Sequence, residues 1–123
     1  MDTQQIAEAF SGHRFSEVYD HLDADVRWVL PGHDGIKGKH DVIAACESSF
    51  ADMAQLASTE FSRFLCVASD RLAAVDAVGR YVSHDGTVSV VSSADIYEFD
   101  ADGRVTTITS YAVELGASTQ DEG

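Results

Sequence analysis

A stretch near the end of the chain constrains the fold more than any other feature. Its hydropathy alternates as in two long strands, Thr87–Phe99 and Arg104–Leu115, with a turn of sequence Asp100-Ala101-Asp102-Gly103 between them. Alternation over this length is typical of strands that are buried on one face. The short polar turn then predicts that the two strands pair antiparallel.

One carboxyl group stands out in this pair of strands. Because side chains alternate between the faces of a strand, Asp95 shares a face with Tyr97. The odd-numbered residues of the second strand, Tyr111 among them, are expected to turn toward the same cavity. Desolvation in apolar surroundings raises the pKa of a carboxyl group, which can then act as an acid or a base. The alternative is an inward carboxylate that a backbone amide or a tyrosine hydroxyl satisfies, without chemistry.

The length and composition indicate one globular domain. Of the 123 residues 45% are hydrophobic, enough for one core and one pocket. We expect a single domain over residues 1–115 and a disordered polar tail over 116–123. No apolar run approaches the roughly 20 residues that cross a bilayer, and the first residues lack the features of a signal peptide. A cytoplasmic location is therefore expected.

The charge and the cysteines exclude several function classes. With 21 acidic against 8 basic residues the net charge is −13, which disfavours nucleic acid and anionic membranes as partners. Cys46 and Cys66 have no short spacing, so they predict buried free thiols. No set of His, Cys and carboxylate residues has the spacing of metal ligands, and no glycine-rich phosphate loop or Ser–His–Asp pattern occurs. We therefore expect no metal and no cofactor.

The order of the predicted elements indicates an α+β domain. Helices precede an antiparallel meander, and such a sheet, wrapped over helices, leaves a cone-shaped cavity. The elements expected in order are a helix to Ser11, a short helix 16–22, a strand 26–30, a loop 31–35, a long helix 40–56, and four strands within 61–68, 71–83, 87–99 and 104–115.

Several short motifs carry a resemblance to a known family. They are Trp28-Val29-Leu30-Pro31-Gly32, Gly38-Lys39-His40-Asp41-Val42, Asp95-Ile96-Tyr97-Glu98-Phe99, Gly103-Arg104-Val105 and Ser110-Tyr111. In this order the chain, from Ile6 to Leu115, resembles the SnoaL-like, polyketide cyclase-like branch of the nuclear transport factor 2-like superfamily. That superfamily also holds ketosteroid isomerases and limonene epoxide hydrolases. The resemblance implies a cone-shaped curved antiparallel sheet wrapped around helices, a cystatin-like α+β barrel.

The resemblance also bears on single residues. Asp95 falls where ketosteroid isomerases place a protonated aspartic acid and where SnoaL-like cyclases place an acid/base aspartate. Leu30 stands where the isomerase has its general base, and the first helix lacks the tyrosine of the isomerase oxyanion hole. Steroid isomerisation by that mechanism is therefore not expected. An epoxide hydrolase needs an Asp–Arg–Asp set, for which Asp76, Arg80 and Asp95 lack the spacing.

The candidate site consists of Asp95, a histidine partner and an apolar wall. His33 lies on the loop after Pro31, so it could divide acid and base work with Asp95 if it reaches inward. A solvated loop histidine is the alternative, and the other four histidines, His13 included, suggest surface or turn positions. The residues expected to bind substrate are Trp28, Leu30, Tyr97, Tyr111, Tyr19 and Phe50, although aromatic residues serve equally in core packing.

Three functions follow as hypotheses. The first is a cofactor-independent enzyme of the cyclase/isomerase type, in which Asp95 moves a proton in an apolar cavity. The second is a non-catalytic protein that binds a small apolar or polycyclic ligand in the same cavity. The third is an interaction protein, since the even face of the strand 87–99 is apolar and the family commonly dimerises through this sheet. A homodimer is therefore expected.

Overall fold

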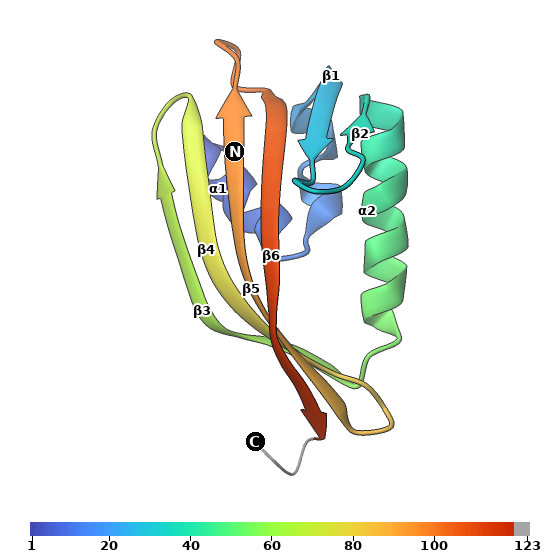
Figure 1. The fold of residues 1–123 in the computed structure, drawn as a ribbon. Helices are drawn as coiled ribbons and strands as arrows, with labels where there is room; N and C mark the ends of the chain where they lie inside the picture. Colours follow the sequence, from blue (N-terminus) through green and yellow to red (C-terminus); the bar gives the residue numbers. More distant parts are fainter. Residues whose placement is uncertain (120–123) are drawn as a thin grey trace.

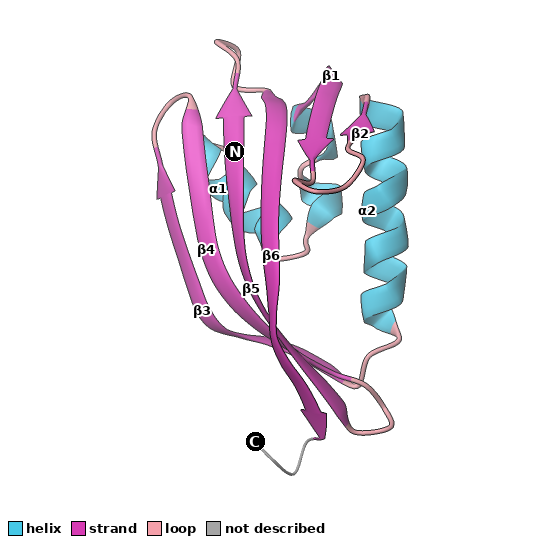
Figure 2. Cartoon of the chain, viewed as in Figure 1, coloured by secondary structure: helices cyan, strands magenta, loops and turns pink. Residues whose placement is uncertain are grey.

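The computed structural model describes residues 1–119, and it confirms the α+β class (Figures 1 and 2). The elements in order are α1 (Thr3–Ser11), short 3₁₀ turns at Phe15–Glu17 and Tyr19–His21, β1 (Leu22–Val29), β2 (Ile36–Lys37), α2 (Lys39–Ala54), β3 (Ser58–Ala68), β4 (Leu72–Val82), β5 (Thr87–Phe99) and β6 (Val105–Thr119). Within this part of the chain, no helix is both long and apolar enough to cross a membrane.

The six strands form one curved, open sheet in the order β2-β1-β6-β5-β4-β3. Strands β3 to β6 form the predicted antiparallel meander. Strand β1 pairs parallel with β6 and antiparallel with β2, so the sheet is mixed, a detail that the sequence did not predict. In Figure 1 the long strands bend across the molecule, with α1 behind them and α2 beside β1 and β2. The cone-shaped arrangement is thereby confirmed.

A capping box at Asp2 starts α1. The Asp2 side chain accepts a hydrogen bond from the Gln5 backbone N–H at 2.8 Å, and the Gln5 side chain accepts one from the Asp2 N–H at 2.9 Å. These bonds satisfy donors that a helix start otherwise leaves unpaired. Ile6 and Phe10 are buried and point to the sheet. The helix therefore closes the inner, concave face of β3, β4 and β5.

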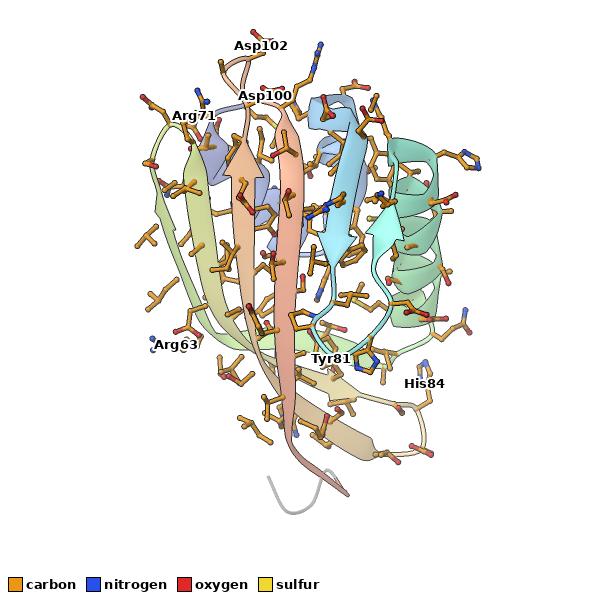
Figure 3. The ribbon with its side chains drawn as sticks, turned by 45° about the horizontal axis from the view of Figure 1, so that its top comes forward. Arg63, Arg71, Tyr81, His84, Asp100 and Asp102 are labelled. Atoms are coloured by element: carbon orange, nitrogen blue, oxygen red, sulfur yellow. The ribbon has the colours of Figure 1, made fainter. Side chains whose placement is uncertain are left out.

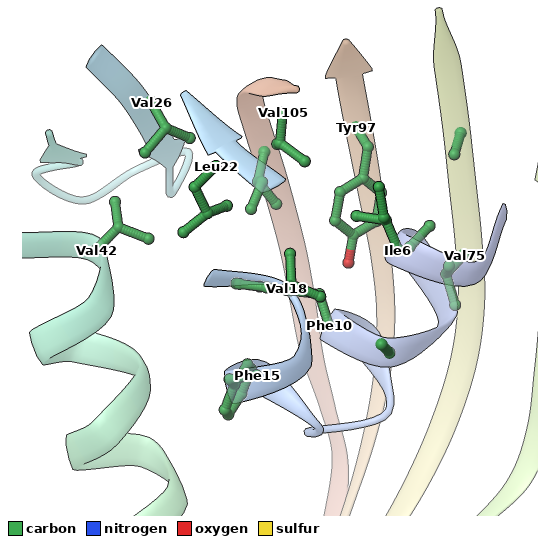
Figure 4. Packing of buried hydrophobic residues seen from close by; sticks show 14 of the residues in the cluster. Ile6, Phe10, Phe15, Val18, Leu22, Val26, Val42, Val75, Tyr97 and Val105 are labelled. Atoms are coloured by element: carbon green, nitrogen blue, oxygen red, sulfur yellow. The ribbon is translucent and has the colours of Figure 1, made fainter. Parts of the chain in front are cut away.

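The core fills the space between α1, β1, α2 and the inner face of the sheet. Figure 4 shows Val18, Val26, Val42 and Val105 converging there from different elements. Tyr97 is fully buried among them. Both cysteines are free thiols; Cys46 is buried, as predicted, whereas Cys66 is only half-buried. Burial, and to a lesser extent the Glu47 carboxylate, raises the pKa of the Cys46 thiol to about 12.

An irregular pairing at the start of β6 corrects the predicted faces of this strand. Phe99 pairs with Val105 but Glu98 pairs with Thr107, so one extra residue of β6 lies between the two pairs. Such a bulge moves the following side chains to the other face. Beyond it the even-numbered residues face inward, and Ser110, not Tyr111, lies opposite Asp95. The prediction that the odd-numbered face of β6 joins Asp95 was wrong beyond Val105.

The ends of several elements also differ from the prediction. Strand β1 begins at Leu22, before the predicted start at residue 26. Strand β2 was not predicted, since two residues carry no periodicity. Strand β6 continues past Leu115, because residues 116–119 pair with 87–90 of β5. The rest of the predicted tail, 120–123, lies outside the described residues.

Candidate active site

Asp95 lies in a cavity of about 380 Å³ between α1, α2 and the inner face of the sheet. The aromatic residues that line it are Phe10, Phe15, Trp28, Phe61, Tyr81 and, at its border, Tyr111. The polar residues that line it are Ser11, His13, Ser49, Asp52, Ser93, Asp95 and Ser110. No three His, Cys, Asp or Glu side chains among residues 1–119 gather so as to hold a metal ion.

A chain of hydrogen bonds fixes one oxygen of Asp95. The Ser11 hydroxyl donates to Asp95 Oδ2 at 2.7 Å, and the Ser11 and Tyr97 hydroxyl oxygens are 2.5 Å apart. Burial, assisted by the Asp95 charge, raises the pKa of Tyr97 well above its usual value. The phenol therefore keeps its proton and donates it to Ser11. Figure 4 shows the Tyr97 hydroxyl pointing toward α1.

The other oxygen of Asp95 is available to a ligand. Within the described part of the chain, no side-chain hydrogen bond reaches Asp95 Oδ1. The carboxyl group is half-buried, and the cavity borders it. Ser11, at the end of α1, thus holds Oδ2, while Oδ1 is free to exchange a proton with a bound molecule.

His13 is a cavity residue that the sequence analysis placed at the surface. It follows Gly12 at the end of α1 and has φ of +68°, a left-handed conformation that is uncommon outside glycine. The chain reverses there through hydrogen bonds from the His13 and Arg14 N–H groups to carbonyls of α1. The turn directs the imidazole to Phe61 and Phe15, at ring-centroid distances of 5.4 and 5.8 Å.

The His13 ring is a neutral group beside Asp95. Burial lowers its pKa from the usual 6.5, and the negative charge of Asp95 opposes that effect only in part. At a pH above this lowered pKa, the imidazole is uncharged and carries one N–H donor and one nitrogen that can accept a hydrogen bond. Among residues 1–119, neither nitrogen of the His13 ring has a hydrogen-bond partner.

Tyr81 supplies a second neutral donor on the same side. Its ring lies over Gly79, where a Cβ atom would come within 2.6 Å of the Tyr81 hydroxyl. Glycine in the middle of a strand thus makes room for this ring. Burial first, and the Asp95 charge second, raise the pKa of Tyr81, so its phenol stays protonated. Figure 3 shows Tyr81 on the lower part of the sheet.

Trp28 and Ser110 form the wall opposite these groups. The Trp28 indole N–H donates to the Ser110 hydroxyl at 2.9 Å, and the ring packs edge-on to Phe10 with centroids 5.2 Å apart. Ser110 of β6 pairs with Asp95 of β5, so the hydrogen bond to Ser110 holds the indole in the wall of the Asp95 cavity. Of the predicted residues, Asp95 and Trp28 therefore come together, and Tyr97 supports Asp95 through Ser11.

Other predicted residues lie elsewhere. His33 and Leu30 line a separate depression of about 440 Å³ at the β1–β2 loop, beside Arg27 and Lys37. The loop turns back at its start, where the His33 N–H bonds to the Leu30 carbonyl, so His33 is not among the residues that line the Asp95 cavity. The pair of Asp95 with His33 is therefore not assembled, and the histidine beside Asp95 is His13.

Tyr19 and Phe50 lie outside the Asp95 cavity, whereas Tyr111 is one of its lining residues but is largely exposed. Strand β6 borders the cavity at Tyr111, but the phenol is 52% exposed and its residue pairs with Ala94 of the outer face. Tyr19 packs beside α2, where burial and then Cys46 and Glu47 raise its pKa to about 12. Phe50 is 56% exposed and lines a smaller adjoining depression, because α2 turns Val42 and Cys46 to the core instead.

Four site residues escaped the sequence analysis: Ser11, His13, Tyr81 and Ser110. The only local signals are a glycine at the end of a helix before His13 and a glycine in mid-strand two residues before Tyr81. Ser11 and Ser110 give no local signal, since their roles come from partners more than eighty residues away. Register and helix docking decide these contacts.

Comparison with known proteins identifies the family. The model of the SnoaL-like domain matches residues 3–108. An NTF2-like protein of unknown function from Cytophaga hutchinsonii is 28% identical, with a TM-score of 0.75, over 89% of this chain and 94% of the other. A proposed polyketide cyclase of Pseudomonas putida is 16% identical, with a TM-score of 0.66, over 90% and 91% of the two chains.

A LEH-like epoxide hydrolase of M. tuberculosis has the same fold. It is 16% identical, with a TM-score of 0.62, over 89% of this chain and 81% of the other. A search of curated proteins returned no match.

Proposed function

Since this chain belongs to the SnoaL-like domain family, we propose that it is a small-molecule enzyme of the cyclase/isomerase type that uses Asp95 for proton transfer. The observation that supports this proposal is the unequal state of the two Asp95 oxygens: Ser11 binds Oδ2, whereas Oδ1 has no side-chain donor among the described residues and borders an aromatic cavity. A carboxylate held in this way is oriented for one task.

The proposed reaction is proton transfer at a carbon next to a carbonyl group. Asp95 Oδ1 takes the proton, the C–H bond breaks, and its electron pair forms an enolate on the substrate. The negative charge that develops on the enolate oxygen needs a neutral donor nearby. His13 and Tyr81 are such donors, because burial keeps the imidazole neutral and the phenol protonated. Return of the proton to another carbon gives isomerisation. Attack of the enolate carbon on a second carbonyl forms a C–C bond, breaks the C=O π bond and closes a ring, and the proton then passes from Asp95 to the new alkoxide oxygen.

The proposed substrate is a small apolar ring compound. The cavity volume of about 380 Å³ is at the small end of ligand pockets. Its walls are mainly aromatic, and its serine hydroxyls offer a few directional contacts. No cofactor is part of the proposal.

An epoxide hydrolase is the less favoured reaction for this chain. Asp76 binds Arg63 at 2.9 Å on the outer face of the sheet, where both side chains are about half exposed. Arg80 lies 3.7 Å from Glu60 on that face. The Asp–Arg–Asp set is therefore not gathered around the Asp95 cavity.

Binding without turnover is the second candidate function. It is favoured because Leu30 stands where ketosteroid isomerases have their general base. Leu30 is apolar and lines another depression, so this position supplies no second base beside Asp95. In this case Asp95 would only hold the ligand through a hydrogen bond. The two functions share the cavity and differ in whether a C–H bond breaks.

Exchange of α-hydrogens for deuterium separates the two functions. A panel of small cyclic ketones is incubated with the protein in D₂O, and deuterium uptake next to the carbonyl is followed by NMR. We expect Asp95→Asn to slow protein-dependent exchange by about 100-fold or more. Asp76→Asn makes the same chemical change on the outer face and should leave the rate unchanged. Ketones that bind without any exchange would support a binding protein, and unchanged exchange in Asp95→Asn would exclude the proposed role.

We also propose that a second copy of the chain covers the outer face of the sheet. Large apolar side chains are exposed there, among them Leu65, Val67 and Val113, at 53, 70 and 61%. An apolar patch of this kind on an otherwise acidic protein favours association. Sedimentation should give a dimer at micromolar concentration, and Val113→Lys should shift it toward the monomer. A wild-type monomer at that concentration would contradict the proposal.

A further inference from the structure

The cavity around Asp95 combines negative charge with a lack of cationic side chains. The carboxyl groups of Asp95 and Asp52 line it, and none of its lining residues in the described chain is a lysine or an arginine. The one basic group in the lining is His13, which burial keeps neutral near neutral pH. The whole protein carries −13 charges. A ligand that enters therefore meets a negative potential.

The end of α1 adds to this potential. Ser11, the last residue of the helix, and His13 just beyond it both line the cavity. The C-terminal end of a helix carries a partial negative charge, and the last turn of α1 contains no basic residue to offset it. The helix thus directs its negative end to the same space as Asp95.

Aromatic rings form a continuous wall next to these charges. The centroid of Phe10 lies 5.2 Å from Trp28 and 5.0 Å from Phe15. His13 continues the series, at 5.8 Å from Phe15, 5.4 Å from Phe61 and 6.1 Å from Tyr81. The faces of such rings attract cations, most strongly where water is excluded. A carboxylate beside several aromatic rings is an arrangement that suits an organic ammonium group.

We propose that this cavity is a site for small organic cations, namely ring compounds with a protonated amine, whose ammonium group binds Asp95 Oδ1 and whose ring packs on the aromatic wall. Neutral ring compounds bind more weakly, and carboxylates are rejected. The inference goes beyond the proposed proton transfer and holds whether or not the protein is an enzyme. An amine that occupies Oδ1 blocks the oxygen that proton transfer requires, so amines without a reactive carbonyl inhibit the exchange reaction.

Three probes of nearly equal size and different charge test this inference. They are 2-phenylethylamine, 2-phenylethanol and phenylacetate, used at about pH 7.5, where an alkylamine is protonated and a carboxylic acid is not. The chain has a single tryptophan, Trp28, in the cavity wall, so its fluorescence reports binding. We expect the amine to bind at least about fivefold more tightly than the alcohol, and phenylacetate to bind more weakly than both.

Two variants show whether Asp95 causes the preference. Asp95→Asn keeps the size of the side chain and removes its charge, so the affinities for amine and alcohol should become equal within about twofold. Asp76→Asn removes a carboxylate from the outer face, and all three affinities should stay as in the wild type. A salt series provides a test on the wild-type protein alone: higher ionic strength should weaken the binding of the amine and not of the alcohol.

The failure of this proposal differs from that of the proposed function. Equal affinities for amine and alcohol in the wild type, tighter binding of phenylacetate, or no binding of any probe at millimolar concentration would each overturn the cation site. The exchange experiment with ketones is read independently of these affinities. A protein that binds amines and never exchanges α-hydrogens would keep the cation site and lose the proposed enzyme activity.

Discussion

The two faces of the sheet give an aspartate side chain opposite surroundings. Asp76 and Asp95 lie on neighbouring strands, and Asp76 pairs across the sheet with Ala94, the residue before Asp95. On the outer face the Asp76 side chain, 53% exposed, binds that of Arg63, 50% exposed, and Figure 3 shows Arg63 extending away from the sheet. On the inner face the described residues give Asp95 one hydroxyl donor and no cationic side chain.

The difference shows which surroundings leave a carboxylate oxygen without a fixed partner. A surface ion pair such as Arg63–Asp76 contributes little to stability and occupies the carboxylate with a fixed partner. Asp95 instead meets neutral hydroxyls and rings, and one of its oxygens remains open to a ligand. Asp76 pairs with Ala94, and because side chains alternate along β5 the next residue, Asp95, lies on the opposite face of the sheet. The face on which a carboxylate lies, and not the residue type, therefore decides which partners it has.

The largest expected effect that tests this comparison concerns the tyrosines of the two faces. Tyr97 is fully buried on the inner face and Tyr111 is 52% exposed on the outer face. We expect Tyr97→Ala to lower the free energy of unfolding by about 3–5 kcal/mol, because it leaves a cavity in the core. Tyr111→Ala should cost less than about 1 kcal/mol. Urea denaturation followed by circular dichroism measures both.

The protein concentration sharpens this pair of substitutions. If a second copy covers the outer face, the cost of Tyr111→Ala rises with protein concentration, whereas the cost of Tyr97→Ala does not. Equal costs for the two substitutions at low concentration would break the distinction between the faces.

The elements that organise the fold could be predicted from local patterns. The cap at Asp2, the alternation of residues 87–99 and the polar turn 100–103 each act within a few residues of the chain. The parallel pairing of β1 with β6 could not be predicted in this way, because it joins segments about eighty residues apart. The faces of β6 were predicted wrongly for a similar reason, since the bulge after Val105 gives no signal in a β-branched run.

A smaller effect is expected from the glycine under Tyr81. Gly79→Ala places a methyl group within 2.6 Å of the Tyr81 hydroxyl and 2.8 Å of its ring, so the ring must move from the inner face. We expect a loss of about 1–3 kcal/mol in the free energy of unfolding, the usual cost of overpacking. Gly116→Ala is the control in β6, where the new methyl group meets no atom within 4 Å. Thermal denaturation measures both, and equal effects would show that Tyr81 does not depend on this glycine.

Of the residues that line the Asp95 cavity, the sequence pointed to Asp95, Trp28 and Tyr111 and not to Ser11, His13, Tyr81 and Ser110. Asp95 and Trp28 could be found because a lone carboxylate and the single tryptophan stand out in stretches whose hydropathy alternates. The choice of His33 over His13 failed because both follow a glycine in a turn, and only the docking of α1 on the sheet brings His13 to the cavity. The left-handed backbone conformation of His13 sets the direction of the chain after α1. This direction decides that the segment after α1 reaches the cavity.

The smallest expected effect is the pH dependence that His13 confers on stability. Burial lowers the pKa of folded His13 below 6.5, whereas the unfolded chain has the usual value. Below pH 6.5 the unfolded state therefore binds more protons, and the free energy of unfolding falls as the pH decreases toward the pKa of the folded state. Above pH 6.5 the contribution is complete and constant. Denaturation by urea between about pH 5 and 8 measures this slope.

Matched variants isolate the contribution of this histidine from those of the other four. His13→Asn removes the titrating ring and keeps a residue that tolerates positive φ, so the slope below pH 6.5 should become smaller. Asp95→Asn removes the charge that opposes the lowering, so the His13 pKa should fall further, which NMR of the imidazole protons follows directly. An unchanged His13 titration in Asp95→Asn would mean that the two groups do not share the cavity electrostatically, and the contrast between the inner and outer carboxylates would lose its main support.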